Sequence, residues 1–334
     1  MTRSFPGKGI YLRSRSWLAL QMAKGTAPFR RYDLSVFHHF APPPSGGGHQ
    51  FLRALIREWR NSGLRVEVNQ ISNTTRACLF NSYNFDPNRL RQLRHPGCRM
   101  VHRVDGPLSV YRGFDDGTDH AIARYNAEWA DATVVQSAFS LRAHERMGLN
   151  FREPILIPNA ADPAIFYPAS RQAKKREWPQ QKIRIISTSW SDNPNKGADV
   201  YEWLDQHLDF SRYDYTFAGR IGIKLRNILV VPPLPSPQLA TLLRQHDLFL
   251  TASQHDPCSN AVIEALACGL PVIYRNSGGH PELVGEGGLG FDAPTQIPSM
   301  LETVVEHYDA IRAKLPAYDI RQIADAYYRV LFPN

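Results

Sequence analysis

The chain has 334 residues, of which 43% are hydrophobic and 21% charged, a composition that excludes a protein disordered along most of its length. At about 150 residues per domain, this length predicts two domains, each large enough to bury its own core. Lysines and arginines exceed aspartates and glutamates by 39 − 31 = 8. This excess suits an anionic ligand, an anionic membrane surface or nucleic acid without choosing among them.

Cysteine usage and hydropathy bear on the compartment. The four cysteines, Cys78, Cys98, Cys258 and Cys268, form no C-x-x-C pair and no regular spacing, which argues against a disulfide framework and against zinc bound by cysteine. No apolar run reaches the roughly 20 residues that a spanning helix needs. We therefore expect a cytoplasmic protein.

Residues 1–31 are basic and precede the first predicted strand. They contain seven lysines and arginines and no acidic residue. Two interpretations stay open: a solvated arm with a short helix, or a basic amphipathic segment that contacts anionic lipid and holds the protein at the membrane periphery.

Two series of short apolar runs alternate with helical patterns. The first series comprises residues 32–40, 64–71, 77–84, 99–105 and 132–136, and the second comprises 182–188, 215–218, 228–231, 248–251 and 271–274. Such alternation predicts βαβ units with parallel sheets. We therefore predict an α/β fold with one domain over 32–169 and another over 182–308.

The remaining segments connect or follow these domains. Residues 170–181 are charged and poor in apolar side chains, as expected of a linker. In the tail, residues 309–334, one apolar face recurs at spacings of three and four, which predicts an amphipathic helix over 318–331. The residues of that face are Ile320, Ile323, Tyr327 and Val330. The cleft between the domains is the expected ligand site.

The most informative motif runs from Ser253 to Val272. A predicted strand ends there, and a polar loop leads to a helix that begins near Ser259 or Asn260. The free N–H groups and positive dipole end of a first helical turn favour a phosphate group. Glu264 lies deeper in this helix, within reach of a ribose, and Asp256 lies eight positions earlier in the loop.

This motif resembles the retaining GT-B glycosyltransferases of family four, the glycosyl transferases group 1. The matching residues are Asp256, Glu264, the run Ala265-Leu-Ala-Cys-Gly-Leu-Pro-Val272 and Gly278-Gly-His-Pro-Glu282. Asp256 stands where the family usually has a glutamate. The resemblance implies two Rossmann-like domains that face a central cleft, with a nucleotide-diphosphate sugar held by the second domain and the acceptor by the first.

Further resemblances follow in the family's order. The loop with Gly46, Gly47 and Gly48 is similar to the family's glycine loop, where absent Cβ atoms let backbone N–H groups approach a phosphate or the transferred sugar. Residues 157–168 are similar to the interdomain hinge, and the tail helix to the one that crosses back to the first domain.

The resemblance also indicates which residues bind the donor. Lys196 matches the family's phosphate-binding lysine, whereas Trp190 stands where the family has an arginine. Arg220, after the next strand, is our candidate for the missing cation. The donor-binding residues then include Ser259, Asn260, Ala261 and Glu264 at the helix start, and the residues assigned to catalysis are Asp105, Lys196 and Asp256.

Asp105 is chosen by its place at the end of a predicted strand. His102, three residues earlier, faces the opposite side of the strand and is expected in the core. A turn-capping role for Asp105 stays open. The cluster Asp115, Asp116 and Asp119 could attract a divalent metal, but we expect no metal and no cofactor beyond the nucleotide sugar.

The expected function is therefore retaining, metal-independent transfer of a hexose to a hydroxyl of a glycan, a lipid-linked or a small-molecule acceptor, as in polysaccharide biosynthesis. The resemblance implies that a diphosphate oxygen takes the acceptor's proton. The alternatives are a nucleotide-sugar epimerase or inverting transferase, and a non-catalytic scaffold that binds a nucleotide sugar or a membrane. We expect no nucleic-acid partner, because basic residues are dispersed beyond residue 31.

Overall fold

The computed structural model describes residues 31–42, 47–169 and 181–333. Nearly all of the predicted basic extension, Gly46 and the predicted linker up to residue 180 lie outside this range. The predictions for these segments remain predictions.

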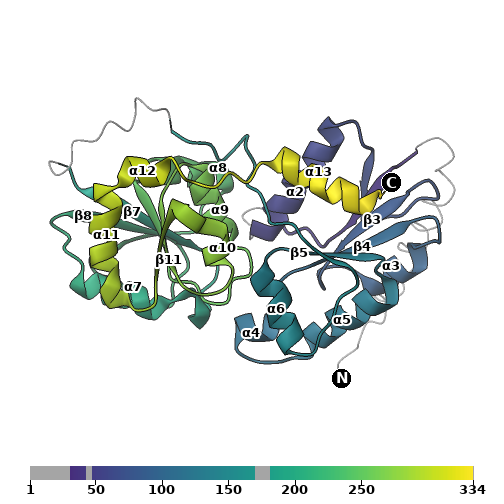
Figure 1. Ribbon diagram of the computed structural model, residues 1–334, viewed down its shortest axis with the longest axis horizontal. Helices are drawn as coiled ribbons and strands as arrows, with labels where there is room; N and C mark the ends of the chain where they lie inside the picture. Colours follow the sequence, from purple (N-terminus) through teal and green to yellow (C-terminus); the bar gives the residue numbers. More distant parts are fainter. Residues whose placement is uncertain (1–30, 43–46, 170–180, 334) are drawn as a thin grey trace, which may run out of the picture.

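The first domain is built on a six-stranded parallel sheet (Figure 1). Its strand order is β2-β1-β3-β4-β5-β6, with β1 Leu34–Phe37, β2 Val66–Val68, β3 Ala77–Asn81, β4 Arg99–Val104, β5 Ala132–Val135 and β6 Pro154–Leu156. The first five strands fall inside the predicted runs. Strand β6 was not predicted, because it has three residues at an exposed sheet edge.

The second domain holds another six-stranded parallel sheet. Its order is β12-β11-β10-β7-β8-β9, with β7 Ile183–Ser189, β8 Tyr213–Gly219, β9 Leu229–Val231, β10 Leu248–Thr251, β11 Val272–Arg275 and β12 Gly288–Phe291. Strand β12 was not predicted, because glycines occupy two of its four positions. A side chain at Gly288 would collide with the Val272 carbonyl.

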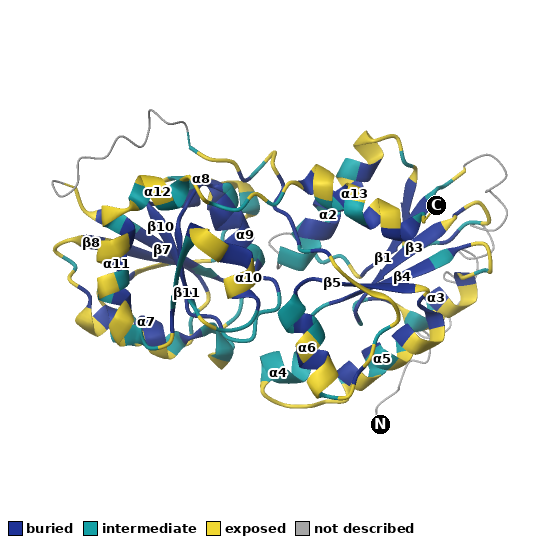
Figure 2. Cartoon of the chain, viewed as in Figure 1, coloured by how far each residue is buried: buried dark blue, intermediate teal, exposed yellow. Residues whose placement is uncertain are grey.

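Helices cover the sheets, and their exposed faces form the outer surface (Figure 2). The first domain has α2 Gly47–Asn61, α3 Pro87–Leu93, α4 Leu108–Arg112, α5 Thr118–Trp129 and α6 Ala138–Arg146. The second has α7 Ala198–His207, α8 Ser236–Arg244, α9 Asn260–Ala267, α10 His280–Val284, α11 Ile297–Glu306 and α12 Tyr308–Arg312. Three-residue 3₁₀ helices cover Pro194–Lys196, Gly285–Gly287 and Pro294–Gln296. This arrangement confirms the predicted α/β fold with two Rossmann-like domains.

The last helix, α13 Ile320–Leu331, returns to the first domain and lies beside α2 (Figure 1). Its buried face includes Ala324 and Tyr327, and the indole Nε1 of Trp59 in α2 donates to the Ala324 carbonyl at 3.2 Å. The predicted tail, residues 309–334, is therefore divided: its beginning belongs to α12, which packs on the second domain, and α13 packs on the first.

The two sheets reverse strand order at β1/β3 and at β7/β10. In open α/β sheets, ligands bind beyond the carboxyl ends of the strands at such switch points. The loops after β1, β7 and β10 are thus the places to look for a site. Within the described residues, no helix has the length and apolar character required to cross a membrane.

Candidate functional site

A cavity of about 180 Å³ lies between the domains, at the switch point of the second sheet. The first domain contributes Gly47 and Tyr111 to its wall, and the second contributes the loops after β7 and β10 and the start of α9. Seven of the residues predicted from sequence line it: Gly47, Lys196, Asp256, Ser259, Asn260, Ala261 and Glu264. Asp105, Gly48 and Arg220 are not among the lining residues.

Lys196 and Asp256 form an ion pair inside this cavity. Lys196 Nζ lies 3.2 Å from Asp256 Oδ2 and 3.2 Å from Ser253 Oγ. Burial acts against both charges, but each group stabilises the other, so the pKa of Lys196 is raised and that of Asp256 lowered. Both groups are charged at neutral pH.

Glu264 is the buried acid of the cavity. It lies in the second turn of α9, its side chain makes no hydrogen bond to the part of the chain that the structure describes, and burial raises its pKa to about 8. Ser259 occupies the N-cap position of α9, but its side chain makes no capping hydrogen bond. The first-turn N–H groups of α9 and the Glu264 carboxyl are thus open to a ligand.

Gly47 of the glycine loop has a packing role in addition to the predicted contact with the ligand. A Cβ atom at Gly47 would collide with the Asn260 side chain, whereas one at Gly48 would meet open space. Gly47 therefore permits α2 of the first domain to approach α9 of the second.

Asp105 lies outside the cavity, in a polar cluster at the carboxyl edge of the first sheet. Its Oδ1 accepts from Arg103 Nη1 at 2.9 Å and from the Gln136 side chain. Its side chain is 32% exposed, and its Oδ2 has no hydrogen-bond partner among the described residues. Among the described contacts, the Asp105 side chain accepts no hydrogen bond from a backbone N–H of its own loop, so the turn-capping role is not seen.

His102 has the core position that strand alternation predicts. It is fully buried, stacks on Phe80 with ring centroids 4.2 Å apart, and its Nε2 lies 2.9 Å from the Ser82 carbonyl. Burial lowers its pKa to about 4. It is a neutral core residue.

Arg220 lies on the surface beside the cavity. Its Nη1 donates to the Trp190 carbonyl at 3.1 Å, and Trp190 itself lines the cavity. Lys196 is thus the one lysine or arginine among the described residues that line this cavity.

The acidic cluster after α4 has local structural roles. Asp119 accepts from the N–H groups of Leu108 and Ser109, each at 2.8 Å, and Asp116 pairs with Arg112 at 2.7 Å. In the described ranges, no group of three His, Cys, Asp or Glu side chains is placed to hold a metal ion.

Tyr111 in α4 was missed by sequence reasoning. Lys196 Nζ lies 5.1 Å from the centre of its ring, and Asn195 Nδ2 donates to its carbonyl at 2.7 Å. The first domain therefore covers the lysine. No local pattern marked this tyrosine, because its role depends on how the two domains meet.

Glu282 belongs to the predicted Gly-Gly-His-Pro-Glu motif and forms an interdomain contact. Its two carboxylate oxygens accept from the N–H groups of Ala138 and Phe139, each at 2.7 Å, and one also accepts from Arg142 at 3.2 Å. A carboxylate at a helix N-terminus is favourable. Glu282 therefore joins α10 of the second domain to α6 of the first.

Two further cavities border the interface. One of about 470 Å³ is lined by Val110 and Phe139 of the first domain and by His255 and Ser277 of the second. Because Val110 and His255 directly precede Tyr111 and Asp256, this cavity adjoins the first one.

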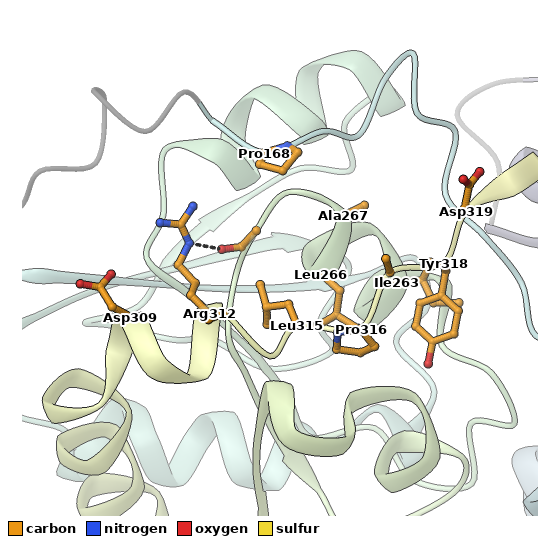
Figure 3. Close-up of a pocket in the computed structure, with 13 residues that line it drawn as sticks. Pro168, Ile263, Leu266, Ala267, Asp309, Arg312, Leu315, Pro316, Tyr318 and Asp319 are labelled. Carbon is orange, nitrogen blue, oxygen red and sulfur yellow. Dashed lines mark hydrogen bonds between the residues drawn. The ribbon is translucent and has the colours of Figure 1, made fainter.

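A larger cavity, of about 800 Å³, lies beside α9, where Leu315 and Pro316 face Ile263 and Leu266 (Figure 3). Arg312 Nε donates to the Gly269 carbonyl at 3.1 Å. This cavity contains none of the predicted site residues.

Two six-stranded parallel sheets with a polar cavity between them define a protein of the GT-B fold class. Sucrose-phosphate synthase from Thermosynechococcus elongatus has this fold with a TM-score of 0.65 and 16% identity, over 91% of this chain and 95% of that one. HepE from Anabaena, solved with UDP-glucose, gives a TM-score of 0.64 and 14% identity, over 90% and 99%.

Residues 224–306 of the second domain match the model of the family described as Glycosyl transferases group 1. Spore coat protein SA of Bacillus subtilis (strain 168) is 33% identical over 101 residues. That match covers 28% of this chain and 26% of the relative.

Proposed function

We propose that this protein is a retaining, metal-independent glycosyltransferase that moves a hexose from a nucleotide-diphosphate sugar to an acceptor hydroxyl. The observation that carries the proposal is the convergence, in one cavity, of Lys196, the uncapped start of α9 and the buried Glu264. A cation and free N–H groups suit a diphosphate, and a carboxyl without a hydrogen-bond partner in the described structure suits ribose hydroxyls.

The ion pair between Lys196 and Asp256 indicates how donor binding rearranges the charges. A diphosphate that reaches Lys196 competes with Asp256 for it, because the two side chains now pair. Once released, the Asp256 carboxylate can accept hydrogen bonds from the sugar. Lys196 then stabilises the negative charge that grows on the leaving diphosphate.

The acceptor enters, in this proposal, through the cavity of about 470 Å³ that adjoins the donor site at Tyr111 and Asp256. A glycan, a lipid-linked acceptor or a small molecule could supply the hydroxyl. A diphosphate oxygen takes its proton, so the protein contributes positioning and charge stabilisation.

The family match and the GT-B fold support a transferase, and HepE, a structural neighbour, was solved with UDP-glucose. Calorimetry with UDP, GDP, ADP and TDP and their glucose conjugates tests the donor site. We expect one nucleotide to bind, with its sugar conjugate also bound. Binding of none would contradict the proposal, and binding without transfer to any acceptor would favour a scaffold.

Two further measurements test the chemistry. Anomer analysis of the product by NMR should show the configuration of the donor, whereas inversion would contradict the retaining assignment. Turnover in EDTA should equal turnover in magnesium, since Lys196 and the start of α9 replace a cation. A tenfold fall on chelation would contradict metal independence.

We also propose that residues 1–31 bring the protein to anionic membranes. The basis is their sequence alone, with seven basic and no acidic residues. Co-sedimentation with phosphatidylglycerol vesicles should depend on this segment and weaken with salt. Equal sedimentation of the chain without residues 1–31 would contradict this role.

A further inference from the structure

A chain of hydrogen bonds leads from a buried arginine to a histidine at the start of α2. Arg103 in β4 is 1% exposed, and its Nη1 donates to Asn81 Oδ1 at 2.5 Å. Asn81 Nδ2 lies 3.3 Å from His38 Nδ1, and His38 Nε2 lies 2.8 Å from His49 Nδ1. The chain thus joins β4, β3, the end of β1 and α2 at the carboxyl edge of the first sheet.

The donors and acceptors along this chain are fixed by its first member. An arginine has only donors, so Asn81 must turn its oxygen toward Arg103 and its NH₂ group toward His38. The NH₂ group can only donate. His38 Nδ1 therefore accepts, and its ring proton is on Nε2.

The same reasoning fixes the proton on His49. His38 Nε2–H donates to His49 Nδ1, and the Ala41 N–H also points to this atom at 3.5 Å. With Nδ1 accepting, a neutral His49 carries its proton on Nε2. Burial lowers the pKa of His38 to about 3 and also lowers the pKa of His49, with Arg53 adding to the effect, so both rings are neutral near pH 7.

Arg103 also connects this edge to the donor helix. Its Nη2 donates to Asn159 Oδ1 at 2.8 Å, and Asn159 Nδ2 donates to Asn260 Oδ1 at 3.2 Å. Asn260 is the first residue of α9 and lines the donor cavity. Gly47, two residues before His49 in α2, also lines this cavity, so the start of α2 that carries His49 borders the donor site.

We propose that His49 is a substrate-binding residue whose Nε2–H donates to a sugar hydroxyl, with Arg103, Asn81 and His38 as positioning residues that fix its tautomer. His49 Nε2 and Asp105 Oδ2 have no hydrogen-bond partner in the described parts of the chain. A hydroxyl group both donates and accepts, so a donor and a carboxylate on the same edge are suited to a polyhydroxyl substrate. This inference rests on the proposed function for its substrate.

The tautomers can be measured without any substrate. In protein labelled with ¹⁵N-histidine, two-bond ¹H–¹⁵N spectra at pH 7 should show Nε2–H for both His38 and His49, assigned by single variants. Asn81→Asp replaces the donor with an acceptor, so His38 should gain a proton on Nδ1. Asn69→Asp is the matched control, because the side chain of Asn69 bonds the backbone of His38 and not its ring. An Nδ1–H tautomer of His49 in the wild type would overturn the relay.

The contact with substrate is tested by two substitutions. His49→Gln keeps an N–H donor and should retain turnover within about threefold, whereas His49→Phe should lose about tenfold or more in kcat/KM. Neither should change the affinity for UDP, or for whichever nucleotide the calorimetric panel selects, because the second domain binds that part. Full turnover of His49→Phe would overturn the substrate contact.

The outcomes separate this inference from the proposed function. If no sugar nucleotide binds the wild type, the proposed function and the sugar contact are both overturned, while the spectra still decide the relay. If a sugar nucleotide binds and is turned over but His49→Phe is unaffected, only the inference fails.

Discussion

Lys196 Nζ and Asp256 Oδ2 lie 3.2 Å apart in the cavity between the domains, so the cation of this site is paired with an anion of the same cavity. The pair prevents an isolated buried charge, which would be costly. A diphosphate must therefore compete with Asp256 for Lys196, so these two residues, both assigned to catalysis from the sequence, are coupled.

Asp256→Asn should separate nucleotide binding from sugar transfer. The substitution frees Lys196, so affinity for the bare nucleoside diphosphate should stay equal or increase. Turnover of the sugar donor should fall, because an amide accepts sugar hydroxyls less well than a carboxylate. Calorimetry and steady-state kinetics on one preparation measure both. An equal loss of affinity for diphosphate and sugar donor would refute this division.

Lys196→Ala should lower kcat by about a hundredfold, because charge on the diphosphate increases toward the transition state. Arg220→Ala should act in the same direction if Arg220 turns from the Trp190 carbonyl toward the diphosphate. The double variant should then show a coupling of at least about 0.5 kcal/mol. Lys182→Ala, which removes a cation paired with Asp214 elsewhere, is the control. Wild-type kinetics of Arg220→Ala would mean that a single side-chain cation suffices.

Glu264→Gln should stabilise the ligand-free protein against unfolding at alkaline pH and weaken nucleotide binding. In the wild type, the unfolded chain releases this proton near pH 4.5 but the folded chain holds it to about pH 8. Stability therefore falls across this window, by about 3 to 5 kcal/mol from this group. Urea unfolding at pH 5 and pH 8 should show the fall in the wild type and a smaller one in the variant.

The same substitution should reveal the ionisation state in the complex. If the ribose hydroxyls bind the carboxylate, nucleotide binding below pH 8 releases a proton, which calorimetry in buffers of different ionisation enthalpy detects. Glu264→Gln should abolish this release and lower affinity by about tenfold or more. Unchanged affinity would remove Glu264 from the site.

Glu282→Gln should weaken the contact between α10 and α6. The amide can accept only through one oxygen, so at least one N–H of Ala138 or Phe139 loses its partner. We expect a loss of about 1 kcal/mol. Small-angle scattering should show a larger radius of gyration without ligand. Glu286→Gln is the control, because Glu286 pairs with Lys314 on the surface of the second domain. It should leave the radius of gyration unchanged.

Sequence patterns predicted most of the fold because buried strands are continuous apolar runs, which β10 and β3 illustrate. The patterns missed two strands that contain no continuous buried apolar run. These are the exposed edge strand β6 and the glycine-rich strand β12. Strand ends could be located to within about three residues, sufficient to place Lys196 and Asp256 at one edge.

The donor half of the candidate site could be inferred because each of its residues follows a strand of one sheet. The remainder could not, because Tyr111 and Glu282 act across the domain interface. Arg103 had a usable signal: an arginine inside an apolar strand, two positions before an aspartate on the same face, is expected to pair with it. That signal was overlooked.

The chain passes between the domains twice, and Pro168 of the first passage lines the same cavity as Leu315 and Pro316 of the second. Because these two connections lie close together, the domains can rotate about the line that joins them. Such a rotation stretches neither connection. Asn159, on the first of these passages, itself bonds Asn260 of the second domain. Helix α6, whose N-terminus Glu282 contacts, lies away from these two passages (Figure 1), so we expect such a rotation to strain this contact. The Glu282 contact therefore opposes relative rotation of the two domains at a point remote from the connections between them.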